Sequence, residues 1–285
     1  MSVFRKVSYN EPHVVHNRER YSMSLQNFRE FAEKLSIEGG NVKKTSSKGT
    51  HYARFLLYLT VLYEEIFHKE FGTLDSFEAL KRLKLIEALP DFRKFNQDEH
   101  NFYSAAINCF SAYLTAQKLS AETFADDQLN ARLMLLTNDE EMRLSEDSPE
   151  YLDGDPSPVP PQSMSYDFYT YPRKLKVSYL AKIRSNWSCE LNPEHRTFNA
   201  QRDGKNFVEA HHLVPMAVQD YYHYTLDFTD NVMTLCPNCH RLVHFAEYHQ
   251  RAEAITKLFS EREKMYDKHG IEVDQKLLLS FYGIL

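Results

Sequence analysis

The chain has 285 residues, of which 42% are hydrophobic and 26% charged, with a formal net charge of −6. This composition is ordinary for a globular protein, and the length suffices for one large domain or two smaller ones. Because no run of about 18 apolar residues occurs, a membrane-spanning helix is excluded. The polar residues after Met1 do not resemble a secretory signal, so we expect a cytoplasmic protein.

The negative charge is concentrated in the N-terminal part of the chain. Residues 167–285 carry 15 basic and 15 acidic side chains, which leaves 19 basic and 25 acidic side chains before them. A net negative charge disfavours nucleic acid as a partner, but a bound metal ion would add positive charge to the neutral C-terminal part. Electrostatics therefore permits DNA binding without predicting it.

The N-terminal part is predicted to be helical. Residues 1–22 show no clear period, whereas apolar residues recur at helical spacing farther along the chain. Asp75-Ser76-Phe77-Glu78 resembles a capping box at the start of one helix. No strand-like alternation occurs before residue 140, so residues 1–138 are expected to form an all-α domain. The predicted helices cover about residues 24–35, 50–69, 75–85, 98–117 and 126–136.

Residues 139–165 are predicted to be a linker. They contain eight acidic side chains and the proline cluster Pro156, Pro158, Pro160 and Pro161. Because like charges repel and prolines stiffen the backbone, we expect an extended, poorly ordered tether. The expected fold class is therefore α+β, with the helical domain joined by this tether to a second domain at residues 166–285.

The cysteines gather in the second domain. Cys189, Cys236 and Cys239 lie in the same part of the sequence as several histidines, while Cys109 stands alone in an apolar helical pattern. Cys109 is interpreted as a small buried side chain. In a reducing compartment, the other three are expected to be metal ligands or buried thiols rather than disulfides.

Residues 207–245 are predicted to form a strand, a loop, a second strand and a helix. Residues 207–214 and 232–235 have the composition of strands, and residues 236–245 have helical character. His240 and His244 are four residues apart and share one face of that helix. His211, on the first strand, can converge with them on one cation.

Three imidazole ligands suit a first-row divalent ion and leave positions open for water and a phosphate oxygen. His212 follows His211 in a strand and points to the opposite face, so it is placed to accept a proton from an attacking water. Histidine has an ordinary pKa of about 6.5, which suits a base near neutral pH. Asn231 can fix the loop over residues 213–230 through backbone hydrogen bonds.

This arrangement resembles the HNH (ββα-metal) nuclease family over about residues 171–245. The resemblance rests on Glu209-Ala210-His211-His212, on Asn231 nine residues before His240, and on Cys236-x-x-Cys239-His240-x-x-x-His244. It implies that His211, His240 and His244 bind a catalytic cation, Mg²⁺ or another divalent ion. It also implies that His212 is the general base and that Asn231 orients the loop. Glu209 would orient a ligand histidine.

The resemblance also implies a second, structural metal. Zinc-stapled members of the family resemble this chain in having a CxxC at the helix start and a second CxxC upstream. Here only Cys189 occurs upstream, and His195 is the nearest competent ligand. The implied Zn²⁺ ligands are therefore Cys189, His195, Cys236 and Cys239.

We therefore expect an endonuclease that hydrolyses DNA, in restriction or phage defence, because family members in those systems resemble this layout of a variable domain ahead of an HNH unit. One site cuts one strand, so a double-strand break needs a homodimer or two events. The helical domain would serve recognition, regulation or oligomerisation, or bind a partner protein. Two alternatives remain: a nuclease acting on RNA or on structured or modified DNA, and a non-catalytic zinc-stapled module that binds nucleic acid.

Overall fold

The computed structural model describes residues 3–38, 47–146, 156–165, 168–201 and 203–285. The chain forms two compact units, Met1–Gln117 with Gly283–Leu285 and Lys118–Tyr282, each described by itself below. In the described part of the chain, no helix is long and apolar enough to span a lipid bilayer.

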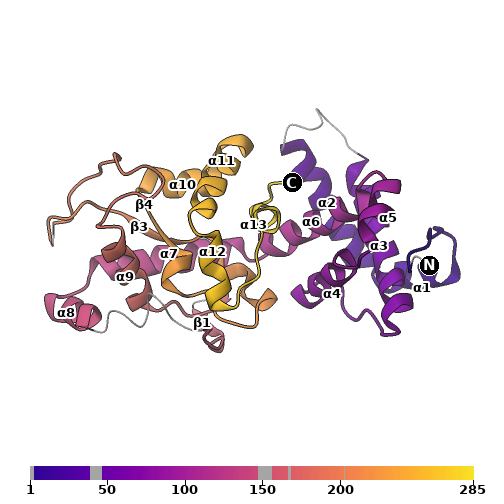
Figure 1. The fold of residues 1–285 in the computed structure, drawn as a ribbon, viewed down its shortest axis with the longest axis horizontal. Helices are drawn as coiled ribbons and strands as arrows, with labels where there is room; N and C mark the ends of the chain where they lie inside the picture. The colour runs from indigo at the N-terminus through magenta and orange to yellow at the C-terminus, as the bar shows by residue number, and fades with distance from the viewer. Residues whose placement is uncertain (1–2, 39–46, 147–155, 166–167, 202) are drawn as a thin grey trace. The chain divides into compact units, whose positions relative to one another are not determined.

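The first unit is helical. Its third helix, α3, packs against α1, α2, α4 and α6, and Leu56, Leu59 and Leu62 on α3 are fully buried. The helices are α1 (Pro12–Arg20), α2 (Ser22–Glu38), α3 (Lys48–Phe67), α4 (Phe77–Glu87), α5 (Phe92–Asp98) and α6 (Phe102–Ala116), as Figure 1 shows.

Two polar residues account for differences from the predicted helices of this unit. Asn17 is buried in α1 and donates hydrogen bonds to Thr60 Oγ1 (3.2 Å) and Glu64 Oε2 (2.9 Å). A paired amide at a buried position interrupts the apolar period, which is why α1 was not predicted. Ser76, not Asp75, caps α4, since its Oγ accepts a hydrogen bond from the backbone N–H of Ala79 at 3.1 Å.

The second unit surrounds a two-stranded antiparallel sheet. β3 and β4 pair with Glu209 opposite Leu235 and His212 opposite Val232, and α9 and α10 pack against both strands. The α+β class is confirmed, although β3 is shorter than the strand predicted at residues 207–214. The elements are α7 (Leu119–Met134), α8 (Asn138–Glu146), β1 (Ser163–Ser165), β2 (Phe168–Thr170), α9 (Leu175–Arg184), β3 (Glu209–His212), η1 (Met216–Tyr221), η2 (Thr229–Asn231), β4 (Val232–Leu235), α10 (Pro237–Phe245), α11 (Tyr248–Ser260), α12 (Glu263–Tyr266), η3 (Asp267–His269) and α13 (Gln275–Phe281).

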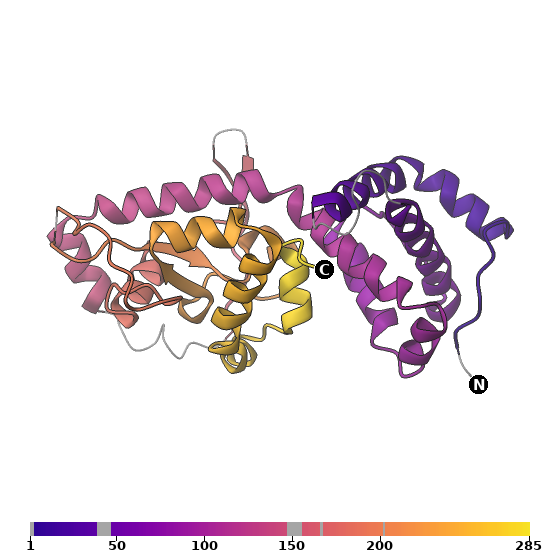
Figure 2. The same cartoon turned by 90° about the horizontal axis from the view of Figure 1, so that it is seen from above.

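The helix α7 belongs to the second unit, along one side of which it runs (Figure 2). Its Leu129 and Leu133 share a buried cluster with Val177, Ala210 and Val232 from α9, β3 and β4. The boundary between the units therefore falls after Gln117, not at residue 138 as the sequence predicted. Burial of the apolar residues of α7 against the sheet explains the difference.

The predicted tether is partly regular structure. Thr137 and Glu140 form a reciprocal capping box at the start of α8, in which the backbone N–H of Thr137 donates to Glu140 Oε2 (2.8 Å) and that of Glu140 to Thr137 Oγ1 (3.2 Å). Acidic residues in the first turn of a helix also interact favourably with its dipole, so this acidic run begins a helix. Residues 147–155 of the predicted tether lie outside the described residues.

Candidate active site and metal centres

Three histidines of the sequence motif meet where β3 faces α10. The ring centroid of His211 lies 5.1 Å from that of His240 and 4.9 Å from that of His244. A fourth residue, Asp126 of α7, joins them, and one ligand atom from each of the four lies within 4.8 Å of the others. The convergence of the three histidines was predicted from the sequence, whereas the position of Asp126 beside them was not.

The hydrogen bonds around His211 leave one ring nitrogen available. Tyr282 donates its hydroxyl proton to the carbonyl oxygen of Leu213 (2.8 Å), so it accepts from His211 Nε2 at 2.9 Å. The proton of His211 therefore sits on Nε2 and the lone pair on Nδ1. This Nδ1 is buried and has no hydrogen-bond partner among the described residues.

The hydrogen bond of His240 likewise fixes which of its ring nitrogens carries the lone pair. Its Nδ1 donates to Glu209 Oε2 at 2.8 Å, which leaves the lone pair on Nε2. That nitrogen is also buried, and no described residue pairs with it. Buried polar atoms without partners are costly, so two such lone pairs in one cluster fit a bound cation.

Burial keeps two of these imidazoles neutral. It lowers the pKa of His211 well below 6.5, with His244 and His240 as further causes. Burial, and then the neighbouring His240, lowers the pKa of His244 to about 4. At neutral pH both rings therefore carry the lone pair that a metal ion requires.

Glu209 lies on β3 and contacts His240 across the sheet–helix boundary. Burial raises the pKa of this carboxyl, but the hydrogen bond from His240 and the electrostatic interaction with it outweigh burial, so that the pKa lies below its ordinary value. A carboxylate that holds the second nitrogen of a histidine fixes its ring orientation. The structure places Glu209 where it can orient His240.

His212 lies on the opposite face of β3 and is 1% exposed. Its Nε2 is 3.0 Å from Asp227 Oδ1, and Asp227 Oδ2 accepts from the backbone N–H of Lys174 at 2.6 Å. If Nε2–H donates to this carboxylate, Nδ1 carries the lone pair and can accept a proton. Asp227 was not singled out from the sequence, where only its position on the long loop could be read.

Asn231 uses its whole side-chain amide to hold the loop after β3. Its Oδ1 accepts from the backbone N–H of Val214 (2.8 Å) and from Tyr266 Oη (2.9 Å). Its Nδ2 donates to the carbonyl oxygens of Val214 (3.0 Å) and Leu226 (2.8 Å). These bonds join the two ends of the loop, which is the geometry expected from the sequence.

The buried face of α7 carries polar residues four positions apart. Glu122, Asp126 and Asn130 are all buried. Arg173, whose side chain is 4% exposed, pairs with Glu122 (2.8 Å) and with Asp126 (2.8 Å). Asn130 makes two hydrogen bonds to the backbone of Ala210 on β3, at 2.7 and 3.1 Å. The helical spacing of these polar residues is the sequence signal that could have found Asp126.

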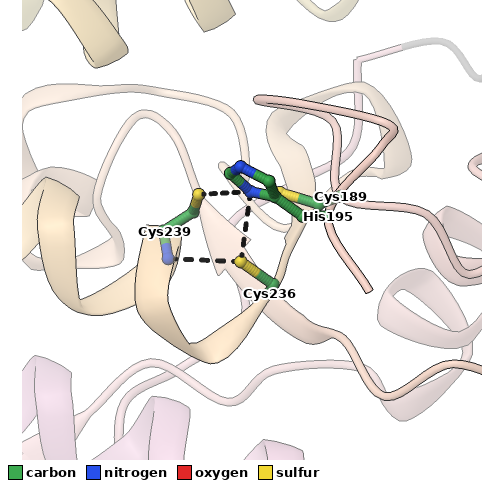
Figure 3. A group of neighbouring side chains, drawn as sticks. All are labelled: Cys189, His195, Cys236 and Cys239. Atoms are coloured by element: carbon green, nitrogen blue, oxygen red, sulfur yellow. Dashed lines mark hydrogen bonds between the residues drawn. The ribbon is translucent and has the colours of Figure 1, made fainter. Parts of the chain in front are cut away.

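A second cluster contains the three C-terminal cysteines and His195 (Figure 3). His195 Nδ1 lies 3.2 Å from Cys239 Sγ and 3.6 Å from Cys236 Sγ, and the four ligand atoms lie within 4.8 Å of one another. Cys236 also caps α10, where its Sγ accepts from the backbone N–H of Cys239 at 3.4 Å. The structure therefore brings together the predicted quartet, including His195 in place of the missing cysteine.

The chemistry of this cluster fits a zinc ion. Burial, together with Cys236 and Cys189, raises the pKa of the Cys239 thiol. Bound metal reverses such a shift, because a coordinating thiol loses its proton. Three thiolates and one imidazole form a closed tetrahedral set that is typical of structural zinc.

Comparisons with known proteins agree with this geometry. The HNH endonuclease family matches residues 189–244, which include both clusters except Asp126. The chain is 40% identical over 77 residues to the type IV methyl-directed restriction enzyme EcoKMcrA of Escherichia coli (strain K12). That match covers 27% of this chain and 26% of the relative, so the chain spans about a quarter of its length. No solved structure matches the chain. The predicted resemblance to restriction-type HNH nucleases is confirmed.

Proposed function

From the HNH endonuclease domain at residues 189–244, we propose that this protein is a metal-dependent endonuclease that hydrolyses phosphodiester bonds in DNA. The single observation that carries the proposal is a pair of buried nitrogens, His211 Nδ1 and His240 Nε2, which lie beside His244 and have no hydrogen-bond partner in the described part of the chain. Both lone pairs are directed by hydrogen bonds on the other side of their rings, which is how proteins prepare histidines for a metal ion.

His211, His240 and His244 would hold the cation, Mg²⁺ or another divalent ion. When bound, such an ion polarises a phosphate oxygen and stabilises the negative charge that develops as the phosphodiester is cleaved. Glu209 and Tyr282 hold two of the ligand rings in place through hydrogen bonds of 2.8 and 2.9 Å.

His212 is the proposed general base. Its Nδ1 accepts a proton from water as the water oxygen bonds to phosphorus, and the bond from phosphorus to the leaving sugar oxygen breaks. Asp227, at 3.0 Å from Nε2, holds the ring and stabilises the imidazolium that forms. Asn231 fixes the loop that carries Asp227 and so positions this pair.

Cys189, His195, Cys236 and Cys239 would bind Zn²⁺ and hold the N-terminus of α10 against the segment after α9. His240 follows Cys239 directly, so this zinc would fix the start of the helix that supplies two ligands to the other cluster. The role is structural because no coordination position remains open for substrate.

The biological role we propose is restriction or phage defence in the cytoplasm, supported by the relationship to a restriction enzyme. A second candidate is cleavage of modified DNA, because that relative is by its name methyl-directed. The helical unit would then recognise the target or bind a partner protein, and a homodimer would supply the second site for a double-strand break.

Incubation of plasmid DNA with the purified protein and Mg²⁺, Mn²⁺ or EDTA tests the proposal. We expect nicking with a divalent ion, no nicking with EDTA, and no nicking by His240→Ala. His249→Ala is the matched control, since His249 is exposed. Cleavage that persists in EDTA and in His240→Ala would contradict the proposal.

Methylated plasmid and RNA, tested as further substrates, separate the candidates. Cleavage of only methylated plasmid would favour the modified-DNA nuclease, and cleavage of only RNA would contradict DNA as the substrate. Binding to nucleic acid without cleavage under every metal would favour the non-catalytic module, in which His212 is dispensable.

A further inference from the structure

Asp126 lies in the histidine cluster although it comes from α7, a helix that precedes the segment matching the HNH family. Its carboxylate offers an oxygen within 4.8 Å of the ligand atoms of His211, His240 and His244, and the residue is 2% exposed. We propose that Asp126 is a fourth protein ligand of the catalytic cation. This inference rests on the proposed function of the three histidines.

The charges around Asp126 support a cation. Asp126 and Glu122 are two buried carboxylates that share one buried guanidinium, that of Arg173. The other neighbour, His212, presents Nδ1 at 3.9 Å from Asp126 Oδ1, a nitrogen that lacks a hydrogen-bond partner in the described chain. A divalent ion beside Asp126 would add positive charge next to these two buried carboxyl groups.

The helix that carries Asp126 is fixed to the strand that carries His211. One turn after Asp126, Asn130 bonds both backbone groups of Ala210, the residue before His211. One turn before it, Glu122 accepts from the backbone N–H of Met216 at 2.9 Å. A ligand held from both sides in this way is preorganised, and it adds metal affinity without an ordering cost.

Four protein ligands constrain which ions support cleavage. Three imidazoles and a carboxylate suit Mn²⁺ or Co²⁺ better than Mg²⁺, which prefers oxygen ligands. A six-coordinate ion would keep two positions for water and a phosphate oxygen. A tetrahedral Zn²⁺ would keep none, so we expect Zn²⁺ at this cluster to inhibit cleavage supported by Mn²⁺.

Calorimetric titration with Mn²⁺ of protein that holds one equivalent of Zn²⁺ tests the proposal without measuring activity. Zinc is retained in the cysteine cluster, and Mn²⁺ has little preference for thiolates. We expect Asp126→Asn to weaken Mn²⁺ binding by at least about tenfold. Substitution of a residue that only holds a metal ligand in place already weakens metal binding by that factor. Asp127→Asn is the matched control: Asp127 is the next residue, with a half-exposed side chain paired with Arg241, and it should bind Mn²⁺ as the wild type does.

The outcome for His240→Ala separates this inference from the proposed function. If His240→Ala binds Mn²⁺ normally, the histidine cluster is not the cation site and both ideas fail. If His240→Ala loses Mn²⁺ while Asp126→Asn keeps wild-type affinity, only the role of Asp126 is overturned.

A crystal structure of the Mn²⁺-loaded wild type tests the same point without any variant, in case Asp126→Asn does not fold. An Asp126 oxygen at about 2.2 Å from the ion, the distance of carboxylate–metal bonds, is the expected result. An ion bound by the histidines with Asp126 outside bonding distance would overturn the proposal.

Discussion

The two clusters are joined by a single peptide bond, because Cys239 belongs to one and His240 to the other, yet they are built differently. In the cysteine cluster, the described side chains contact one another, with His195 Nδ1 near two sulfurs. In the histidine cluster, His211 and His240 are each held from outside the cluster, by Tyr282 and Glu209. A closed set of soft ligands suits a structural ion, and oriented imidazoles with open positions suit a reactive one.

One short helix, α10, can therefore contribute to two kinds of metal site when the elements that contact its two parts differ. Cys236 and Cys239 lie at the N-terminus of α10, where the first turn presents both sulfurs to the loop carrying Cys189 and His195. His240 and His244 lie on the face of the same helix that meets β3 and α7. The direction in which each side chain leaves α10 therefore determines which of the two clusters it belongs to.

Among the substitutions that distinguish the two clusters, His212→Ala is expected to have the largest effect, and this effect is on the cleavage rate. Loss of the proposed base should lower the cleavage rate by about 10²- to 10⁴-fold, the usual contribution of general base catalysis. Mn²⁺ affinity should not change, because His212 is not a ligand. Single-turnover cleavage measures the rate, and Mn²⁺ titration measures the affinity. A His212→Ala variant that nicks DNA at the wild-type rate would contradict the assignment of His212 as the base.

Removal of a sulfur from the cysteine cluster should mainly lower the stability of the fold. Cys239→Ser is expected to lose its zinc and to lower the free energy of unfolding by several kcal/mol, since structural zinc contributes directly to folding. Metal analysis and urea denaturation measure the two effects. Cys109→Ala is the control because Cys109 is buried in the first unit; a variant of Cys239 with its full zinc content would rule out the quartet.

Asn231→Ala should cost about 2–3 kcal/mol of stability. The substitution leaves the backbone groups of Val214 and Leu226 and the Tyr266 hydroxyl without their partner, and buried unpaired groups are costly. The cleavage rate should fall as well, because the loop carries Asp227. Unchanged stability in urea denaturation would show that this amide does not hold the loop.

The last prediction concerns the pH dependence of the metal-free protein. The pKa values of His211 and His244 are lowered in the folded state, that of His244 to about 4, whereas an unfolded histidine has a pKa of about 6.5. Between these values the unfolded chain binds more protons, so stability falls as pH drops from about 6.5 toward 4, by at most about 1.4 kcal/mol per pH unit for each histidine. Urea denaturation in EDTA at several pH values measures this slope, and His211→Gln should reduce it. A pH-independent free energy of unfolding over this range would contradict the burial of neutral rings.

The three histidines of one cluster could be predicted because their convergence follows from local geometry, whereas the cysteine quartet with His195 was implied by the resemblance to zinc-stapled family members. The four-residue spacing of His240 and His244 selects one face of a helix, and alternation in a strand separates His211 from His212. The order of strand, loop, strand and helix could also be predicted, because each segment has the composition typical of its structure.

The acidic residues of the site could not be predicted because tertiary contacts select them. Asp126 lies 85 residues before His211 and meets it only because α7 packs on β3. Asp227 is one of several carboxylates on its loop, and only the folded loop shows which one reaches His212. The boundary at residue 138 failed for a related reason: composition located the acidic, proline-rich stretch, but burial of Leu129 and Leu133 assigns α7 to the second unit.

The measurement that tests the central claim most directly is the metal content of two variants that are purified with their bound zinc and then dialysed against Mn²⁺ alone. The account predicts that Cys239→Ser loses zinc and keeps Mn²⁺, and that His240→Ala keeps zinc and loses both Mn²⁺ and plasmid nicking. Loss of both metals from folded His240→Ala, or loss of neither, would contradict two separate metal sites on one helix.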